Sequence, residues 1–394
     1  MVNKYLPYVL GGIEGHIADI SRELCKNPEL SIDVLGASPD LNKPRVSKQE
    51  NLSQNLRWHE VATWKTIANT PIAPHLSQKI IEMSSSADII HMHMPYPYGD
   101  YAYLRALVKS DTLKDIPLVV TYHADIVKQK EIKKLYKPVM NKFLSRAHTI
   151  IVSSPQLKEN SSDLAPFKDK VEVIPFGCDT EFFKQYVVGD KRHEAQAYRA
   201  ELSMSEHKRP LILFVGRLVY YKGIEVLLKA LTQIDADLVI VGKGPLKTSL
   251  VQQSLELKLT HRVRFIDQLS LENLAKAYAA ADVLCLPSIA NSEAFGLVQI
   301  EAHAAKTPTV ASALTTGVSF ATKHGVDGLL FESGNDKELA RSLNMLFTHK
   351  DLLEKLSEQA FKRAQEVFSF EQMTQKTLEV YKHSIGFFKS HISS

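Results

Sequence analysis

The sequence predicts an α/β protein made of two doubly wound domains, each with a parallel sheet. Short apolar runs alternate with amphipathic helical stretches in both halves of the chain, a pattern typical of parallel sheets that helices cover on both faces. A length of 394 residues suits two domains, and the polar, charged stretch 186–209 separates the halves. We expect a first domain over 1–185, a linker region with some helix over 186–209, a second domain over 210–370, and a helix over 371–394.

The expected strands are the short apolar runs, taken in chain order. In the first half they cover 32–35, 89–93, 118–121, 149–152 and 171–174. In the second half they cover 211–215, 238–241, 263–265, 283–286 and 309–311. The stretch Met1 to Tyr5 looks like only the tail of a buried strand. Either this strand is stunted or the recorded start lies late.

Composition argues against several classes of protein. A net charge of +4 is too small to indicate nucleic-acid binding by itself. No apolar run approaches the roughly 18 residues that would span a bilayer, and the start lacks the apolar core of a signal peptide. Cys25, Cys178 and Cys285 lie far apart and form no Cys-x-x-Cys motif. They favour a reducing, cytoplasmic compartment over a disulfide framework or a cysteine-based zinc site.

A basic amphipathic stretch runs from Lys128 to Arg146. It contains seven basic residues and only one acidic residue, Glu131. Apolar residues such as Phe143 alternate with them and make the stretch amphipathic. Such a stretch can lie on an anionic membrane surface. It can equally be the solvated face of an ordinary helix, and the sequence leaves both interpretations open.

Two carboxylates, Glu293 and Glu301, stand eight positions apart, between an expected strand and an expected helix. The first lies in a loop at the carboxyl end of its strand, where doubly wound folds bind ligands. The second is expected about two turns into the helix. One carboxylate could then hold a sugar hydroxyl and the other a ribose. Backbone N–H groups where this helix opens suit an anion; they belong to Phe295, Gly296 and Leu297.

A second ligand loop follows the strand at 211–215. Arg217 and Lys222 are five positions apart, just before a helix expected to begin near Ile224. An arginine fork, a lysine point charge and the positive end of a helix can converge on one diphosphate. Gly216 and Gly242 each follow a strand, and glycine allows another group to approach the backbone closely.

Further candidates lie in the first half. Gly11 and Gly12 precede a helical pattern, so their backbone can approach a phosphate. His91 and His93 share one face of a strand, but no third metal ligand lies near them in the sequence. Asp235 and Asp237 precede their strand, at the end away from the expected ligand, and we reject them as a metal site.

These motifs together resemble retaining glycosyltransferases, most closely glycosyltransferase family 4. The resemblance covers nearly the whole chain, and its motifs are His91-x-His93-x-Pro95, Thr121-Tyr-His123, Gly216-Arg217 with Lys222-Gly223, Val241-Gly-x-Gly-Pro245, and Glu293 with Glu301. After Glu301 the chain departs from the family pattern at His303, Ala305 and Lys306. The departures affect helix packing and a turn rather than the carboxylates.

The resemblance implies a GT-B fold, in which two Rossmann-like domains face each other across a cleft and the final helix crosses back to the first domain. It implies a metal-independent, retaining transfer from a nucleotide sugar, with no cofactor. Arg217 and Lys222 would stabilise the leaving diphosphate, Glu293 would hold sugar hydroxyls, and Glu301 would hold the ribose. His123 would lie near the transferred sugar, and Gly216 and Gly242 would let the nucleotide approach the backbone.

On the acceptor side, the resemblance implies that Asp125 orients the acceptor or His123, and that His91 and His93 form a wall of the cleft. The acceptor would be a glycan or a lipid-linked glycan of a bacterial surface polysaccharide. Residues 121–130 resemble mannosyl- and rhamnosyltransferases, which favours GDP-mannose over a UDP-hexose as donor. A nucleotide-sugar 2-epimerase of the same fold, and a binding subunit without activity, are the alternatives.

Overall fold

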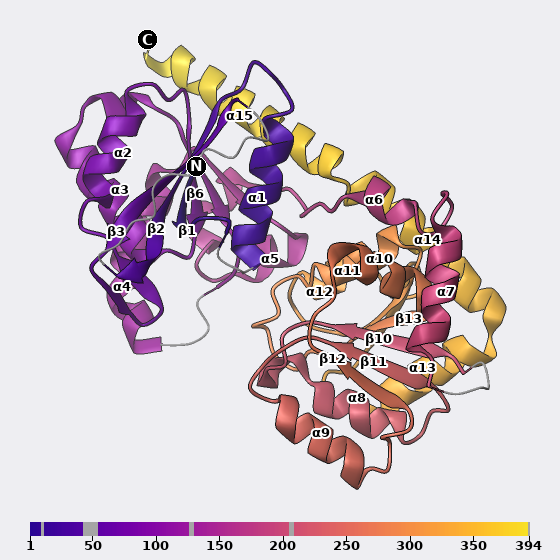
Figure 1. Cartoon of the computed structure of the whole chain (residues 1–394). Coiled ribbons are helices and arrows are strands. Elements are labelled where there is room, and N and C mark those ends of the chain that lie inside the picture. Colours follow the sequence, from indigo (N-terminus) through magenta and orange to yellow (C-terminus); the bar gives the residue numbers. More distant parts are fainter. Residues whose placement is uncertain (9–11, 42–53, 126–129, 205–208, 393–394) are drawn as a thin grey trace. The chain divides into compact units, whose positions relative to one another are not determined.

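The computed structural model describes the chain except for residues 9–11, 42–53, 126–129, 205–208 and 393–394, and for the side chains of 130–133 and 387–392. The chain forms two compact units, one of residues 1–176 with 370–394 and the other of 177–369 (Figure 1). Each unit contains one parallel sheet between layers of helices. The predicted fold class is therefore confirmed, and all the apolar runs predicted as strands form strands.

The first unit contains a seven-stranded sheet. In spatial order its strands are β3 (Leu56–Thr63), β2 (Ile32–Leu41), β1 (Val2–Tyr5), β6 (Ile90–Met94), β7 (Leu118–Tyr122), β8 (Thr149–Val152) and β9 (Val171–Val173). Neighbouring strands pair in parallel, as His93 opposite Thr121 illustrates. A separate antiparallel hairpin consists of β4 (Lys65–Ile67) and β5 (Thr70–Ile72).

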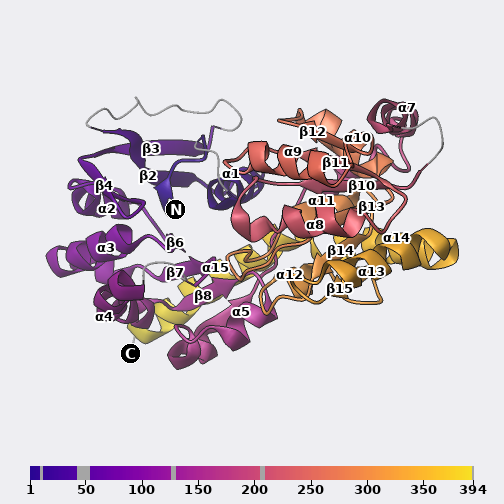
Figure 2. The ribbon, with the colours of Figure 1, turned by 90° about the horizontal axis from the view of Figure 1, so that it is seen from below.

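Helices cover both faces of this sheet, as Figure 2 shows. Met92 and Val120 face a core shared with α2, α3 and α4, whereas Val119 and Ile151 face α1 and α15. Strand alternation therefore places His91, His93 and Thr121 on the side of α1 and α15. The helices are α1 (Gly12–Leu24), α2 (Leu76–Ser84), α3 (Pro97–Lys109), α4 (Lys130–Arg146), α5 (Pro155–Asn160) and α15 (Phe370–Ile392), with 3-10 turns η1 (Thr112–Asp115) and η2 (Ala165–Lys170).

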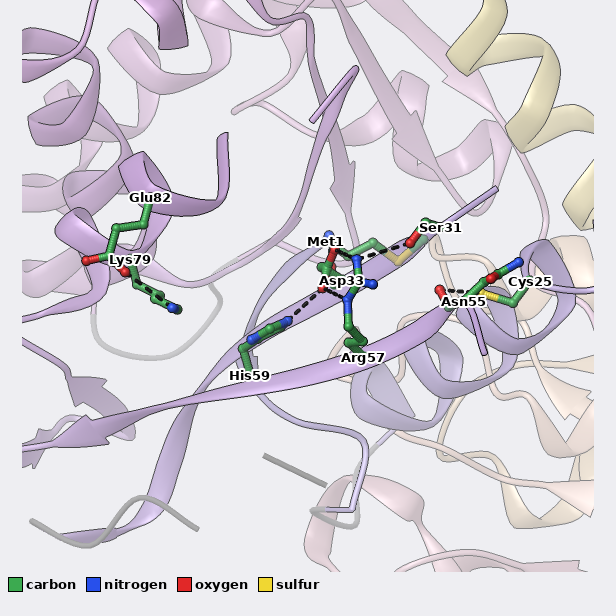
Figure 3. A network of polar contacts seen from close by, with 9 residues as sticks. All are labelled: Met1, Cys25, Ser31, Asp33, Asn55, Arg57, His59, Lys79 and Glu82. Atoms are coloured by element: carbon green, nitrogen blue, oxygen red, sulfur yellow. Dashed lines mark hydrogen bonds and ion pairs between the residues drawn. The ribbon is translucent and has the colours of Figure 1, made fainter. Parts of the chain in front are cut away.

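A polar network ties edge strand β3 to β2 (Figure 3). The Arg57 guanidinium donates two hydrogen bonds of 2.8 Å to the Asp33 carboxylate, and His59 Nε2 lies 2.6 Å from Asp33 Oδ1. The hydrogen bond from Arg57 holds the pKa of Asp33 far below its usual range. These residues explain why a strand with charged side chains can pair at the sheet edge, although its sequence lacks the apolar run used to predict strands.

The second unit contains a six-stranded sheet. In spatial order its strands are β12 (Val263–Ile266), β11 (Asp237–Val241), β10 (Leu211–Val215), β13 (Val283–Leu286), β14 (Thr309–Ser312) and β15 (Gly328–Phe331). All five pairings are parallel. The carboxyl ends of the strands therefore open on one edge of the sheet, where the loops that follow β10, β11 and β13 lie.

Helices again lie on both faces (Figure 1). Ile212 and Phe214 pack against α8, α9 and α13, and the other face carries α10 and α11. The helices are α6 (Thr180–Lys184), α7 (Arg192–Leu202), α8 (Ile224–Leu231), α9 (Lys247–Glu256), α10 (Leu271–Ala280), α11 (Val298–Ala304), α12 (Val318–Ala321), α13 (Asp336–Thr348) and α14 (Lys350–Val367), with the 3-10 turn η3 (Tyr220–Lys222).

The unit boundaries differ from those expected from the sequence. The first unit ends at Phe176 rather than 185, and the second ends at Ser369. The stretch expected as a linker, 186–209, lies within the second unit, where its helix α7 packs against α10. Arg199 of α7 bonds Asp282 at 2.7 Å, so the charges that suggested a linker partly serve to attach this helix.

A buried ion pair fixes the end of α14 in the second unit. The Asp327 carboxylate is fully buried and lies 2.6 Å from an Arg363 guanidinium nitrogen. Arg363 also donates to the carbonyl oxygens of Phe320 and Ala321 and lies over the Phe368 ring at 4.7 Å. Removing one partner of such a pair leaves a buried charge uncompensated.

We expect Asp327→Asn to lower the free energy of unfolding by about 3–5 kcal/mol, because Arg363 would keep its charge in a largely dry site. Urea denaturation followed by circular dichroism measures this change. Glu366→Gln is the matched control: it breaks the exposed Lys362–Glu366 pair on the same helix and should cost less than about 1 kcal/mol. An equal loss of unfolding free energy in the two variants would show that burial does not make the Asp327–Arg363 pair more important than the exposed pair.

Candidate active site

The loops after β10 and β11 pack tightly against each other at the carboxyl edge of the second sheet. A side chain at Gly242 would place its Cβ 1.9 Å from the carbonyl oxygen of Gly216. Only glycine at 242 permits this approach. Arg217 extends from the first loop and is exposed, so its guanidinium is accessible to a ligand.

Lys222 and Glu293 form a buried ion pair at this edge. Lys222 ends η3, Glu293 lies in the loop between β13 and α11, and Nζ is 2.6 Å from Oε2. Ser288 Oγ donates to the same oxygen at 2.9 Å. Within the described residues both donors reach Oε2 and none reaches Oε1. The arrangement fixes one carboxylate oxygen and leaves the other to accept a hydrogen bond.

The loop that holds Glu293 continues to α11. Gly296 has a φ of 75°, in the left-handed region, so the helix begins only at Val298. Glu301 therefore lies in the first turn of α11, and the expectation of about two turns was wrong. The buried Gln299 donates 2.7 Å to the Phe295 carbonyl, which fixes the loop against the helix.

Phe295 anchors the same loop in an aromatic cluster. Its ring lies 6.5 Å from that of Phe320 and 6.2 Å from that of Phe368. Both of these rings contact Arg363. The ion pair of α14 thus supports the loop that carries Glu293.

Glu301 also has a hydroxyl partner. The Tyr278 hydroxyl from α10 donates 2.6 Å to Glu301 Oε2. Neither Tyr278 nor Ser288 was identified from the sequence, because a hydroxyl within a helix or after a strand has no diagnostic spacing. Only the fold brings them to the two carboxylates.

In the first unit four histidines converge. His91 and His93 stack with ring centroids 4.4 Å apart, and His93 Nδ1 lies 3.0 Å from His123 Nε2. His16, from the start of α1, lies edge-on to His93 and His123 at 5.9 and 5.4 Å. The prediction that His91 and His93 share a face is confirmed. His16 was not among the predicted site residues, because it lies far from the others in sequence.

The environment of this cluster favours the neutral form of its histidines. Burial lowers the pKa of His16 to about 4 and lowers the pKa values of His91, His93 and His123 well below the usual range. Neutral imidazoles have one donor and one acceptor nitrogen. The contact between His93 and His123 therefore uses one proton and sets the tautomer of both rings together.

The remaining candidates of the first unit lie as follows. Asp125 Oδ1 accepts hydrogen bonds from Tyr122 at 2.8 Å and Ser161 at 2.6 Å, so these hydroxyls hold its carboxylate. Gly12 is exposed at the start of α1, and Gly11 lies outside the described residues.

Among the described residues, no group of three or more His, Cys, Asp or Glu is placed to hold a metal ion. Asp235 and Asp237 instead face Arg209, at 2.8 and 3.7 Å. No helix in this part of the chain has the length and apolar character needed to cross a membrane.

Comparisons with known proteins cover both units. The family profile described as Glycosyltransferase Family 4 matches residues 10–182, and that described as Glycosyl transferases group 1 matches 199–363. O-antigen chain mannosyltransferase C of Escherichia coli is 30% identical over 96% of this chain and 95% of that protein. D-rhamnosyltransferase WbpZ of Pseudomonas aeruginosa is 29% identical over 93% and 90%.

A solved structure gives the same fold over the whole chain. Anabaena Alr3699/HepE, in complex with UDP-glucose, superposes with a TM-score of 0.74 at 20% identity. The match covers 97% of this chain and 99% of that one. At this identity the likeness establishes the architecture, which is the GT-B fold.

Proposed function

Because this chain belongs to glycosyltransferase family 4, we propose that it moves a hexose, with mannose favoured, from a nucleotide-diphosphate sugar to a glycan or lipid-linked acceptor. The pathway would be the synthesis of a bacterial surface polysaccharide, and the enzyme would act in the cytoplasm. The similarity to an O-antigen mannosyltransferase supports this choice of sugar. The observation that carries the proposal is the buried pair of Lys222 and Glu293 at the carboxyl edge of the second sheet.

The pair suits a donor with a charged leaving group. The bond between the anomeric carbon and the diphosphate oxygen breaks, and negative charge develops on the diphosphate. Lys222 and the exposed Arg217 would stabilise that charge, with the backbone N–H groups of Phe295, Gly296 and Leu297 as further donors. We propose that these groups take the place of a metal ion, and that no cofactor takes part.

Glu293 would orient the transferred sugar. Ser288 and Lys222 hold Oε2, so Oε1 would accept a hydrogen bond from a sugar hydroxyl. The acceptor oxygen would bond to the anomeric carbon on the face that the leaving group vacates, which retains configuration. Its proton would pass to the leaving phosphate.

The histidine cluster would serve the sugar and acceptor side. His123 would contact the sugar through Nδ1, since Nε2 already faces His93. His91 and His93 would form the wall behind it. Asp125, whose carboxylate is held by the hydroxyls of Tyr122 and Ser161, would orient the acceptor or His123.

A donor panel tests the function. GDP-mannose, a UDP-hexose and a dTDP-hexose are each tested for thermal stabilisation, since a ligand that binds only the folded state raises Tm. We expect the largest shift with GDP-mannose, and transfer to a glycan acceptor that persists in excess EDTA. A larger shift with a UDP-hexose would reassign the donor. Conversion of the donor without an acceptor would favour a 2-epimerase, and loss of transfer in EDTA, restored by magnesium or manganese, would overturn metal independence.

The two carboxylates should divide their roles. Glu293→Gln should mainly lower kcat, because the reacting ring would lose its orientation. Glu301→Gln should mainly weaken nucleoside diphosphate binding, by about 1.5–3 kcal/mol for a lost hydrogen bond to a charged group. Steady-state kinetics and calorimetric titration measure the two effects. Glu272→Gln, an exposed acid on α10, is the control, and full kcat in both site variants would remove the carboxylates from the mechanism.

We further propose that α4 contacts an anionic membrane. Lys134, Lys137 and Lys142 are exposed on this helix, and Leu135 between them is 83% exposed. An exposed leucine among lysines suits a surface with both lipid headgroups and acyl chains. Of the wider basic stretch, Lys128 lies outside the described residues, as do the side chains of Lys130 and Lys133.

Replacing Lys134, Lys137 and Lys142 by Glu should weaken sedimentation with phosphatidylglycerol vesicles, since each cation near such a surface contributes about 1 kcal/mol. Donor binding should not change, because the nucleotide residues belong to the other unit. A control variant replaces the exposed Lys229, Lys350 and Lys355 by Glu and carries the same net charge. If both triple variants sediment like wild type, α4 presents an ordinary solvated face.

A further inference from the structure

Tyr278 lies in α10 of the second unit and contacts Glu301, the carboxylate proposed to hold the ribose. Its side chain is fully buried in α10, and its hydroxyl donates 2.6 Å to Glu301 Oε2. Its backbone carbonyl accepts a hydrogen bond of 2.7 Å from Thr307 Oγ1. The ring lies edge-on to Phe183 at 5.9 Å. Backbone and ring are thus both fixed, so the hydroxyl is presented in one place.

Toward Glu301 the phenol acts as a hydrogen-bond donor. Burial and the neighbouring Glu301 raise the pKa of Tyr278 well above its usual value, so the proton stays on the oxygen. Glu301 lies in the first turn of α11 and is only half-buried. The hydrogen bond from Tyr278 limits the rotamers of this flexible side chain, which lowers the entropy that ordering it would cost when a ligand binds.

We propose that Tyr278 is a positioning residue for the ribose of the donor: it holds the Glu301 carboxylate in the orientation that accepts the ribose hydroxyls. This inference rests on the proposed role of Glu301. It gives the two carboxylates a common design, since Ser288 holds Glu293 as Tyr278 holds Glu301. A phenylalanine would fill the same apolar space, so the hydroxyl is the part of the side chain that the role requires.

The test compares GDP with 2′,3′-dideoxy-GDP, which lacks the ribose hydroxyls. UDP and its dideoxy analogue are measured in parallel. For the nucleotide that wild type prefers, calorimetry should show tighter binding of the ribose form. Tyr278→Phe should reduce that preference by about tenfold, the size of one hydrogen bond to a charged group, while kcat stays within about twofold. The dideoxy form should bind both proteins alike.

A double-mutant cycle tests whether Tyr278 affects ribose binding through Glu301. Glu301→Ala should abolish the ribose preference, and adding Tyr278→Phe to it should change nothing more. Tyr186→Phe removes another buried tyrosine hydroxyl of the same unit and should leave the preference unchanged. If Glu301→Ala abolishes the preference but Tyr278→Phe retains it, the positioning role is wrong. If Glu301→Ala itself retains the preference, the proposed role of Glu301 fails instead.

A second variant covers the case in which Tyr278→Phe does not fold. Glu301→Asp keeps the charge but shortens the side chain, so the carboxylate could not reach Tyr278 and the ribose together. It should lose most of the ribose preference. An undiminished preference in Glu301→Asp would overturn the proposal.

Discussion

A buried charge needs an opposite charge beside it, and the carboxyl edge of the second sheet is built around that requirement. Lys222 and Glu293 supply it for each other. Removing either would leave the other uncompensated at a cost of several kcal/mol. The diphosphate of the proposed donor would meet a lysine already in position and largely desolvated, so little reorganisation would remain to be done. The carboxylate is held at the same oxygen by Ser288 as well, so it would keep its orientation if the lysine acquired a second anionic neighbour.

The stability of this edge depends on residues well away from it in sequence. Asp327 and Arg363 fix the end of α14, and Arg363 packs on Phe320 and Phe368. These rings support Phe295, which anchors the loop carrying Glu293. A substitution near α14 would therefore affect activity through the position of the loop, without touching a ligand.

Much of this fold could be predicted from the sequence, because strands buried on both faces are recognisable as apolar runs. Edge strand β3 was not predicted, since the charges that stabilise it, such as Asp33 opposite Arg57, look like surface residues. The carboxylates and the basic loop could be proposed from the sequence because their spacing resembles the family's motifs. Tyr278 and Ser288 were not, because their contacts depend on tertiary packing alone. At Lys306, one of the departures from the family pattern, the backbone adopts the left-handed conformation with a φ of 59°, which the preferences of lysine would not predict.

The path of the chain between its units has a consequence for synthesis on the ribosome. The second unit is one continuous segment, 177–369, whereas the first is completed only by α15. Until α15 emerges, the apolar residues that pack against it, including Ile20, Val119 and Ile151, lack those contacts. His91 likewise lacks its 2.6 Å contact with Tyr381. The second unit can therefore be complete while the first is still open. A nascent chain stalled after residue 369 would expose an apolar sheet face and become a target for chaperones, although most of its residues were already in place.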